Sequence, residues 1–583
     1  MRLAAVLVAC AACGVAIAAQ TTPPAAGAIP PVRLSDVTAA AGLAVTHQNG
    51  AAGRKLLPET MGSGSAFVDV DGDGDQDLLI VSGVWPPQGS AVARLFTNDG
   101  KGHFTEATAG SGLDAAAPSR VTAPPGGALA RQAGPVAGGL EYGMGIAAGD
   151  FDNDGAPDLL LTGVGNNRLF RNLGNGRFTD VTAKAGLAGR RAFSTSAMWL
   201  DYDKDGRLDL LISNYVQWTP ETDVFCAPDG KAKSYCTPEA YRGSTSWLYR
   251  NRGDGTFEDV TARAGFFDAT SKSLGVTLLD YDQDGWPDVF IANDTQPNKL
   301  YRNNGNGTFT ELGLKAGVAF SLEGRARAGM GVDAVELDGT GRPTLAVTNF
   351  AGEMLGLFRP DAAGQYTDSA PTSDIGRATR QTLGWGCFFF DVDLDGRQDL
   401  LVVNGRLDPL RAYGAGADTP HLFYNAGQRF VDIAGQVGEA FAKPKTGRGA
   451  AFADIDGDGD LDAIVTTNGG PVYLYRNDLP AGARSLRLRL AGTTSNRDAI
   501  GARVTVRVGR TSASRLVRTG SSYLSQSELP LTFGLGAAAR ADDVIVLWPS
   551  GKHEALGGLP AGEYTVTEGR GVTNRRAPAP SRP

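Results

Sequence analysis

Short apolar segments on either side of acidic stretches recur along most of the chain. Segments such as SAFV, AMWL and CFFF precede these stretches, and runs such as LLIV and LLIS follow them. Apolar runs of this length, bounded by Asp and Gly, are typical of β-strands, so each unit predicts strand, acidic loop, strand. Seven units occur at intervals of 51 to 81 residues, and they start at Asp69, Asp150, Asp201, Asp280, Glu336, Asp391 and Asp454.

A second motif follows each acidic unit and predicts a second hairpin. RLFRNLGNGRFTD and KLYRNNGNGTFTE are two examples, with Asn and Gly at the turn. Four strands per repeat, seven times over, predict an all-β fold with a seven-bladed β-propeller over residues 34–480. Insertions at residues 113–137 and 218–242 interrupt the spacing. We expect both to project from one face.

The phase of the repeats predicts how the ring closes. The usual sequel to the second hairpin is DVTxxAGL, but the last hairpin, VYLYRN at residues 472–477, has none. The missing piece, DVTAAAGL, begins at Asp36 with no hairpin before it. The N-terminal segment should therefore complete the last sheet and remove its free edge.

The acidic loops repeat a pattern of oxygen donors. In the six full copies aspartates occupy positions 1, 3, 5 and 9, and glycine occupies position 6. Hard divalent ions take six to eight oxygens, and alternate residues of a tight turn bring their side chains to one point. Position 7 varies in type, as expected of a ligand that coordinates through its backbone carbonyl. An EF-hand would need Glu at position 12, where Ile80 and Leu161 stand.

The pattern predicts about six Ca²⁺ ions, one for each full loop, and magnesium is disfavoured because it prefers a stricter octahedron. The Glu336 copy has Thr340 and Thr344 at positions 5 and 9, so its site is expected to be weak or empty. The predicted metal residues are Asp69, Asp71, Asp73, Asp75, Asp77, Asp150, Asp152, Asp154, Ala156, Asp158, Asp201, Asp203, Asp205, Arg207, Asp209, Asp280, Asp282, Asp284, Trp286, Asp288, Asp391, Asp393, Asp395, Arg397, Asp399, Asp454, Asp456, Asp458, Asp460 and Asp462.

Charge is distributed unevenly along the chain. The net charge of -8 divides into about -16 before residue 481 and +8 after it, and the acidic front disfavours nucleic acid as a partner.

Residues 1–19 resemble a signal peptide with an A-x-A cleavage site, and residues 20–33 form a Pro-rich linker. Cleavage at Cys10 would leave too short an apolar region for a lipoprotein signal. No later run is long enough to span a bilayer, so an exported protein is expected: secreted, periplasmic or at the cell surface. Residues 571–583 are expected to be a disordered tail.

Three cysteines lie beyond the signal peptide. Cys226 and Cys236 flank a Pro/Gly/Lys loop, and in an exported protein they predict a disulfide rather than a zinc site, since the four histidines are scattered. Cys387 lies in an apolar strand and is expected to be buried.

Two sets of motifs carry a resemblance to known families. The loops resemble the FG-GAP/VCBS repeats of integrin α-chain propellers, and NRDAIGARVTVRVG and GSSYLSQSELPLTFGLG resemble the ASPIC/UnbV module. Together they resemble the cartilage acidic protein family over residues 34–570, which implies an extracellular calcium-binding protein. Alternating strands over residues 481–570 predict a small β sandwich or barrel. Arg487, Arg489, Arg503 and Arg507 are expected either to form a solvated face or to contact the propeller or an anionic glycan.

The function hypotheses differ in what they require. The first is an interaction or adhesion module that binds a protein or glycan on a propeller face, without catalysis. The rival is a polysaccharide lyase or glycosidase. No catalytic motif is present, and the metal loops account for the abundant aspartates, with no acidic residue in an evident pocket outside them. The sequence therefore favours the interaction module.

Overall fold

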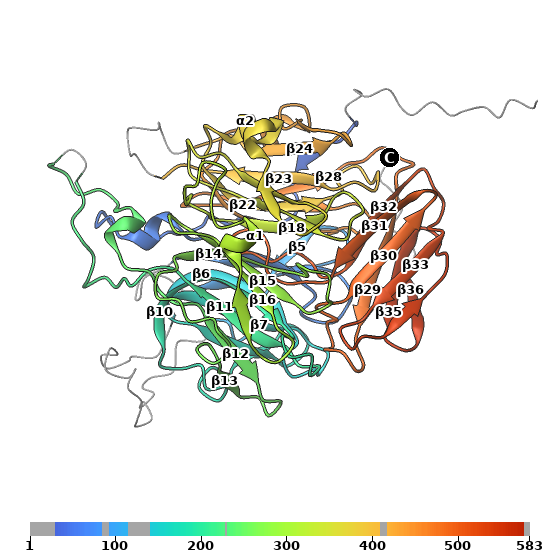
Figure 1. Ribbon diagram of the computed structural model, residues 1–583, viewed down its shortest axis with the longest axis horizontal. Helices are drawn as coiled ribbons and strands as arrows, with labels where there is room; N and C mark the ends of the chain where they lie inside the picture. The colour runs from blue at the N-terminus through green and yellow to red at the C-terminus, as the bar shows by residue number, and fades with distance from the viewer. Residues whose placement is uncertain (1–29, 84–91, 115–139, 228–229, 408–416, 577–583) are drawn as a thin grey trace, which may run out of the picture.

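The structure is a computed structural model that describes residues 30–83, 92–114, 140–227, 230–407 and 417–576 (Figure 1). The predicted signal peptide, most of the linker and most of the insertion at 113–137 lie outside these residues. The described part is built almost entirely from strands. Its few helices are short: η1 (Leu57–Thr60), η3 (Pro238–Ala240), α1 (Gly313–Ala316), η4 (Ala370–Thr372), α2 (Asp374–Thr379) and α3 (Glu439–Ala442).

Seven four-stranded blades follow one another along the chain. Blade 1 contains β2 (Ser65–Val68), β3 (Asp77–Val81), β4 (Ala93–Asn98) and β5 (Phe104–Glu106). Blade 2 contains β6 (Leu140–Gly149), β7 (Asp158–Asn166), β8 (Arg168–Asn172) and β9 (Phe178–Asp180). Blade 3 contains β10 (Arg191–Leu200), β11 (Asp209–Asn214), β12 (Trp247–Asn251) and β13 (Phe257–Asp259). Blades 2 and 3 are also joined by pairing of β7 with β10.

The other four blades have the same order. Blade 4 contains β14 (Ser273–Leu279), β15 (Asp288–Asn293), β16 (Lys299–Asn303) and β17 (Phe309–Glu311). Blade 5 contains β18 (Val332–Glu336), β19 (Pro343–Val347), β20 (Gly356–Pro360) and β21 (Tyr366–Asp368). Blade 6 contains β22 (Gly384–Phe390), β23 (Asp399–Asn404), β24 (His421–Asn425) and β25 (Phe430–Asp432). Blade 7 contains β26 (Gly447–Ala453), β27 (Asp462–Thr467), β28 (Tyr473–Asn477) and β1 (Leu34–Asp36).

The blades form a closed ring. Their first strands contact one another in the order β2, β6, β10, β14, β18, β22 and β26, and β26 returns to β2. Neighbouring blades pack face to face, so the second strands, such as β3 and β11, are buried along their whole length. This burial explains why they are short continuous apolar runs in the sequence.

The N-terminal segment closes the ring as predicted. Strand β1 pairs antiparallel with β28, with Leu34 opposite Asn477 and Asp36 opposite Tyr475. The Ser35 hydroxyl also donates a hydrogen bond to Asp478, 443 residues away in sequence. The outer edge of β28 is therefore covered, and blade 7 has four strands like the other blades.

The C-terminal region is a sandwich of two four-stranded sheets (Figure 1). One sheet has the order β32-β29-β35-β36 and the other the order β31-β30-β33-β34. The strands are β29 (Arg484–Ala491), β30 (Arg503–Val508), β31 (Thr511–Leu516), β32 (Leu531–Gly536), β33 (Asp543–Leu547), β34 (His553–Ala555), β35 (Gly562–Thr567) and β36 (Gly571–Arg576). Trp548 is fully buried in its core.

One predicted boundary is wrong. Residues 571–576 were expected to belong to a disordered tail, but they form β36, which pairs antiparallel with β35. Strand β36 covers the edge of β35, so the backbone N–H and C=O groups of β36 form hydrogen bonds within the sheet rather than with water. Residues 577–583 lie outside the described part of the chain.

The connection between β31 and β32 enters the ring of blades. We call residues 517–528 the central segment. Gln526 donates its backbone N–H to Ser65 and accepts one from Phe67, while Ser522 does the same with Val332. Thr519 exchanges hydrogen bonds with the backbone of Trp199 through its hydroxyl.

The remaining blades contact the central segment as well. Ile146 of blade 2 donates to the Leu524 carbonyl, and Arg518 donates to Thr277 of blade 4. The Tyr523 ring meets Trp385 of blade 6 edge-on, with centroids 5.0 Å apart, and Glu528 donates its N–H to Phe452 of blade 7. The central segment therefore fills the axis of the propeller and satisfies the inward-facing backbone groups of its first strands.

Candidate metal centres and a pocket on the opposite face

The aspartate at position 9 joins two strands in every full loop. In blade 1, Asp77 accepts the N–H of Val70 through one oxygen and the N–H of Asn98 through the other, at 2.9 and 2.8 Å. The same pair of bonds is made by Asp158, Asp209, Asp288, Asp399 and Asp462. Each of these side chains is buried at the start of a second strand, which fixes the loop relative to the second hairpin.

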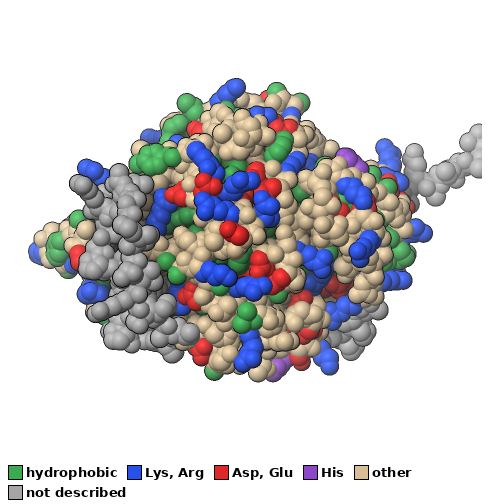
Figure 2. Space-filling model, turned by 90° about the horizontal axis from the view of Figure 1, so that it is seen from below, with side chains coloured by type: hydrophobic (Ala, Val, Ile, Leu, Met, Phe, Trp, Pro, Cys, Tyr) green, Lys and Arg blue, Asp and Glu red, His purple; other side chains and the backbone are tan. Residues whose placement is uncertain are grey.

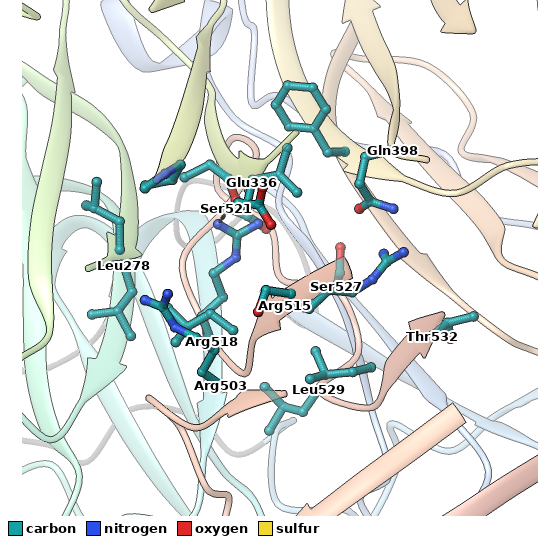
Figure 3. A pocket seen from close by; sticks show the side chains of 18 of the residues that line it. Leu278, Glu336, Gln398, Arg503, Arg515, Arg518, Ser521, Ser527, Leu529 and Thr532 are labelled. Atoms are coloured by element: carbon teal, nitrogen blue, oxygen red, sulfur yellow. Dashed lines mark hydrogen bonds between the residues drawn. The ribbon is translucent and has the colours of Figure 1, made fainter. Parts of the chain in front are cut away.

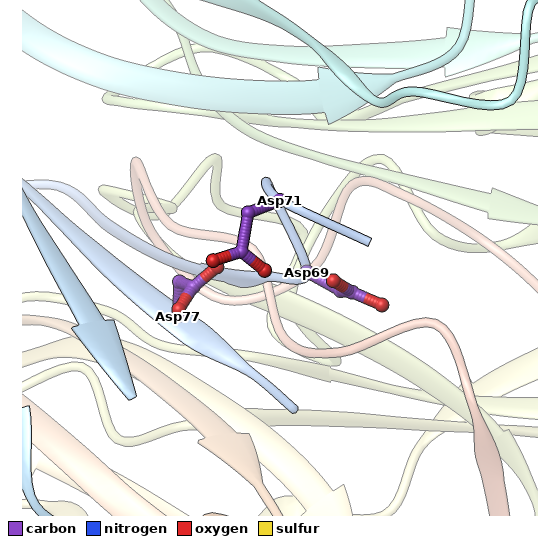
Figure 4. Close-up of side chains that lie close together, drawn as sticks. All are labelled: Asp69, Asp71 and Asp77. Carbon is purple, nitrogen blue, oxygen red and sulfur yellow. The ribbon is translucent and has the colours of Figure 1, made fainter. Parts of the chain in front are cut away.

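The fold gathers positions 1, 3 and 9 of a loop around one point. Carboxylate oxygens of Asp69, Asp71 and Asp77 lie within 4.8 Å of one another, and Figure 4 shows the three side chains. The corresponding groups are Asp150, Asp152 and Asp158; Asp201, Asp203 and Asp209; Asp280, Asp282 and Asp288; and Asp391, Asp393 and Asp399. In the last loop, Asp454, Asp456 and Asp462 interact electrostatically.

Position 5 lies outside these groups of three. An arginine of the third strand contacts positions 3 and 5 together in three blades. Arg171 donates to Asp152 and Asp154 at 2.5 and 2.7 Å, and Arg250 and Arg302 contact the corresponding pairs in blades 3 and 4. These arginines supply positive charge beside the carboxylate groups, where the sequence analysis expected only a metal ion.

The groups of carboxylates fit a cation. Burial, with repulsion from neighbouring aspartates, raises the pKa of Asp158 to about 9, of Asp288 to about 8 and of Asp77 to about 7. Several buried carboxylate oxygens have no hydrogen-bond partner: Oδ1 of Asp152, Asp203, Asp280, Asp282 and Asp391. Unpaired buried acceptors that converge on one point are what a hard divalent ion requires.

The Glu336 loop of blade 5 makes different contacts from the full loops. Its Thr340 hydroxyl donates to Asp338 within the turn. Arg342, at position 7, donates to the backbone carbonyl of Tyr281 in blade 4 at 3.0 Å. This loop therefore contacts its neighbour through an arginine.

In five of the six blades that have a full loop, an asparagine at the end of the third strand makes that contact with the preceding blade, and the sequence analysis missed it. The side-chain amide of Asn172 donates to the Val70 carbonyl of the preceding blade at 2.9 Å. Asn98, Asn251, Asn303 and Asn477 make equivalent bonds to Ile455, Phe151, Tyr202 and Val392. This Asn recurs in the LFRN and LYRN motifs of the sequence, and a role in the following turn alone does not explain its recurrence.

Arginines of the C-terminal sandwich contact position 1 of several loops. Arg489 donates to Asp69 at 3.2 Å and Arg503 to Asp280 at 2.7 Å. Arg487 lies 3.2 Å from Asp454 and forms two hydrogen bonds to Glu528. Of the alternatives left open by the sequence, contact with the acidic propeller is therefore the one that holds for these three, and a solvated face is wrong for them.

Arg507 remains on the surface of the sandwich, 3.7 Å from Asp542. On the side of the molecule shown in Figure 2, basic and acidic side chains are interspersed. Part of the positive charge of the C-terminal half thus forms ion pairs with the acidic propeller, and these pairs join the sandwich to it.

The insertion at residues 218–242 lies at the end of the propeller opposite the sandwich (Figure 1). Cys226 and Cys236 are bonded there, which confirms the predicted disulfide, and Cys387 is buried and free. The insertion, η1 and the connections after β11, β15 and β19 surround a pocket of about 170 Å³. These connections follow the second strands, so the pocket lies at the far end from the acidic loops.

The pocket contains acidic side chains outside the metal loops, which overturns the expectation that none stands in a pocket. Asp294, Glu353 and Glu239 line it together with the rings of Tyr215 and Trp385. Tyr215 donates to Asp294 at 2.6 Å. Burial and the nearby glutamates raise the pKa of Asp294 to about 7, and burial raises that of Glu353. The three acids are far apart in sequence, so no local motif marks them.

Comparisons with known proteins agree with this architecture. Residues 150–212, 221–291 and 280–347 match the FG-GAP-like repeat, and residues 492–573 match ASPIC and UnbV. The chain is 25% identical over 429 residues to cartilage acidic protein 1 of Mus musculus, which covers 70% of this chain and 62% of that protein. For the Homo sapiens protein the values are 24%, 70% and 60%. The match thus spans about six tenths of these relatives.

One solved structure that the comparison matched is the BP39L lectin from Burkholderia pseudomallei. It has a TM-score of 0.40 and 9% identity, and the alignment covers 72% of this chain and 96% of the lectin. Within the described residues, no helix is both long and apolar enough to cross a membrane.

Proposed function

Because the chain belongs to the cartilage acidic protein family, we propose that it is an exported calcium-binding protein whose free propeller face binds an extracellular protein or glycan. The Cys226–Cys236 disulfide supports export, since such bonds persist in oxidising compartments. The disulfide fits a secreted, a periplasmic or a cell-surface protein equally well. Nucleic acid is not proposed as a partner.

Calcium would be held by the carboxylates at positions 1, 3 and 9 of the six full loops and by the carbonyl oxygen of position 7. Position 5 would add a further oxygen, shared with the third-strand arginines. The bound ion would supply the positive charge that these buried carboxylates lack. The unpaired oxygens and the raised pKa values support this assignment most directly.

The position of the sandwich supports a ligand on the opposite face. Sandwich and central segment together cover the face with the acidic loops and fill the axis of the ring. The pocket with Asp294 and Glu353 therefore opens on the propeller face that the sandwich leaves free. Aromatic walls with a few converging polar groups are typical of a binding site.

Binding to a panel of extracellular glycans tests this function. The purified protein should bind a subset of them, and the double variant Asp294→Asn/Glu353→Gln should lose about tenfold or more in affinity, because charge-assisted hydrogen bonds contribute about 1.5–3 kcal/mol each. Glu106→Gln, an exposed acid paired with Arg94, is the matched control and should bind normally. Equal binding by all three proteins would place the ligand elsewhere.

A second candidate is a polysaccharide-active enzyme, and one observation favours it. Asp294 has a pKa of about 7 beside Glu353, and two carboxyl groups in unlike environments are the requirement for acid–base chemistry on a glycosidic bond. Release of reducing ends or unsaturated sugars from bound polysaccharides by the native protein, but not by Asp294→Asn, would support this candidate over a pure binding module.

A further inference from the structure

A second cavity lies between the propeller and the sandwich, on the side of the acidic loops. It has a volume of about 120 Å³ and is lined by residues of blades 4 to 7, the sandwich and the central segment (Figure 3). Gly341 and Pro343 place it beside the Glu336 loop, which has lost two of its carboxylates. A space of this size holds several non-hydrogen atoms.

Three guanidinium groups line the cavity, and two of them are paired. Arg503 donates to Asp280 at 2.7 Å, and Arg518 donates to Asp333 and to the Ala334 carbonyl, both at 2.5 Å. Arg515 differs. Its Nε and Nη2 have no hydrogen-bond acceptor, and the nearest carboxylate oxygen of Asp391 is 3.8 Å away.

Arg515 is held in place by packing. Its side chain is only 11% exposed, and the guanidinium lies over the Phe533 ring, 4.8 Å from the centroid. Burial lowers its pKa to about 10, so the group stays positively charged at neutral pH. A buried cation that lacks an acceptor is unfavourable unless another group supplies one.

The propeller contributes a second unpaired donor to the same cavity. Gln398, at position 8 of the blade 6 loop, is 7% exposed, and its side-chain Nε2 has no partner. Figure 3 shows Gln398 and Arg515 on the wall of the cavity, one from each side of the boundary between propeller and sandwich. Two unpaired donors from different parts of the fold therefore line one space.

The acids around the cavity are already engaged. Both Glu528 oxygens accept from Arg487, Asp280 accepts from Arg503, and Glu336 accepts the N–H of Gly339. Asp391, the carboxylate nearest to Arg515, accepts the N–H groups of Gly396 and Gly534. The free donors of Arg515 and Gln398 are therefore left for a ligand from outside the chain that carries acceptors and negative charge.

We propose that this cavity binds a small oxyanion, such as sulfate, phosphate or a carboxylate, through Arg515 and Gln398. Guanidinium groups bind planar and tetrahedral oxyanions with paired hydrogen bonds. The bound anion would link the sandwich to blade 6 beside the loop that is expected to lack calcium. This site is separate from the pocket on the free face and does not depend on its ligand.

Calorimetric titration of the full-length protein with sodium sulfate, in calcium-replete buffer and at constant ionic strength, tests the proposal. Sulfate should bind the native protein, and Arg515→Gln should weaken it about tenfold or more, since it removes a charge-assisted pair of hydrogen bonds. Arg507→Gln, which changes a surface arginine of the same sandwich, should bind like the native protein.

Gln398→Met keeps the test decisive if Arg515→Gln does not fold. It replaces an unpaired donor with an apolar side chain of similar size, so stability without sulfate should be equal or higher, while sulfate affinity falls. A selenate soak of crystals should place an anomalous selenium peak in the cavity within hydrogen-bond distance of Arg515.

The two possible sources of the anion are separated by a second titrant. Equal affinity for free sulfate and for a sulfated oligosaccharide indicates a site for a free ion, whereas much tighter binding of the oligosaccharide indicates that the anion is part of a larger ligand. Absence of sulfate binding together with no selenium peak in the cavity would overturn the proposal, as would equal weakening by Arg507→Gln.

Discussion

Asn251 of blade 3 donates its side-chain amide to the Phe151 carbonyl of blade 2, at 2.7 Å. The same amide also donates to Leu208, and its oxygen accepts the N–H of Gly253. One side chain thus joins two blades, a second strand and a turn. Equivalent asparagines repeat the contact around most of the ring, so its stability rests partly on polar bonds between blades.

Replacement of this residue should be costly. Asn251→Ala leaves two buried carbonyls without a donor and is expected to lower the free energy of unfolding by about 2–4 kcal/mol. Asn425→Ala is the matched control, because Asn425 bonds only within its own blade and should lose about 1–2 kcal/mol. Chemical unfolding monitored by fluorescence measures both, and equal losses would show that the bond between blades is not the important one.

Calcium content should follow the number of full loops. Elemental analysis after dialysis against calcium should find about six ions per chain, and chelation should lower the melting temperature by linkage. Asp282→Asn, at position 3 of the blade 4 loop, should remove about one ion, whereas Glu336→Gln should remove none. Two ions or fewer in the native protein would contradict the assignment of these loops as a set.

The sandwich should depend on Glu568 in a pH-dependent way. Burial alone would raise the pKa of this carboxyl, but the Ser550 hydroxyl and the N–H groups of Ser495, Thr493 and Thr494 hydrogen-bond to it and lower the value to about 2. A lowered carboxyl pKa stabilises the fold above the unfolded value of 4.5, and this stabilisation is lost as the pH falls towards 2.

Glu568→Gln should therefore lower stability at neutral pH by about 1–3 kcal/mol and flatten the decline between pH 4.5 and 2. Glu563→Gln, on strand β35, which ends one residue before Glu568, serves as the control. Thermal melts across this pH range decide the matter, and parallel curves for Glu568→Gln and the native protein would refute the role given to Glu568.

Docking of the sandwich should depend on Arg487. Its buried guanidinium lies between Glu528 of the central segment and Asp454 of blade 7. Arg487→Met leaves both carboxylates without this partner and is expected to cost about 3–5 kcal/mol. Arg507→Met should cost less than about 1 kcal/mol, because its ion pair is exposed. Differential scanning calorimetry compares the two, and similar costs would contradict the buried role of Arg487.

Removal of the closing strand should expose blade 7. Deletion of residues 33–46 takes away β1, which leaves β28 with unpaired backbone groups along one side. Aggregation at concentrations where the native protein is monodisperse is the expected result, measured by light scattering. A deleted protein that stays monodisperse with an unchanged melting temperature would show that the ring does not need this strand.

The sequence by itself determined the repeat, the acidic loops, the disulfide and the closing strand. Each is readable because its physical cause is local: carboxylates at alternate positions of a turn, apolar runs of strand length, two cysteines ten residues apart, or a motif that one end has and the other lacks. Even the central segment left a trace, because glycines on or directly before the first strands make room for it. A Cβ at Gly64 would lie 2.2 Å from the Leu524 carbonyl oxygen.

Only the tertiary structure decided what meets across the ring. Asp294 and Glu353 share a pocket, and Arg515 and Gln398 share a cavity, although each pair comes from different parts of the chain. Long-range packing brings these side chains together, and no spacing of residues along one strand or loop encodes it. The docking of the sandwich determines the partners of buried charges such as Arg487, and it leaves Nε and Nη2 of Arg515 without a hydrogen-bond acceptor. The sequence pattern left open whether these arginines contact the propeller or solvent.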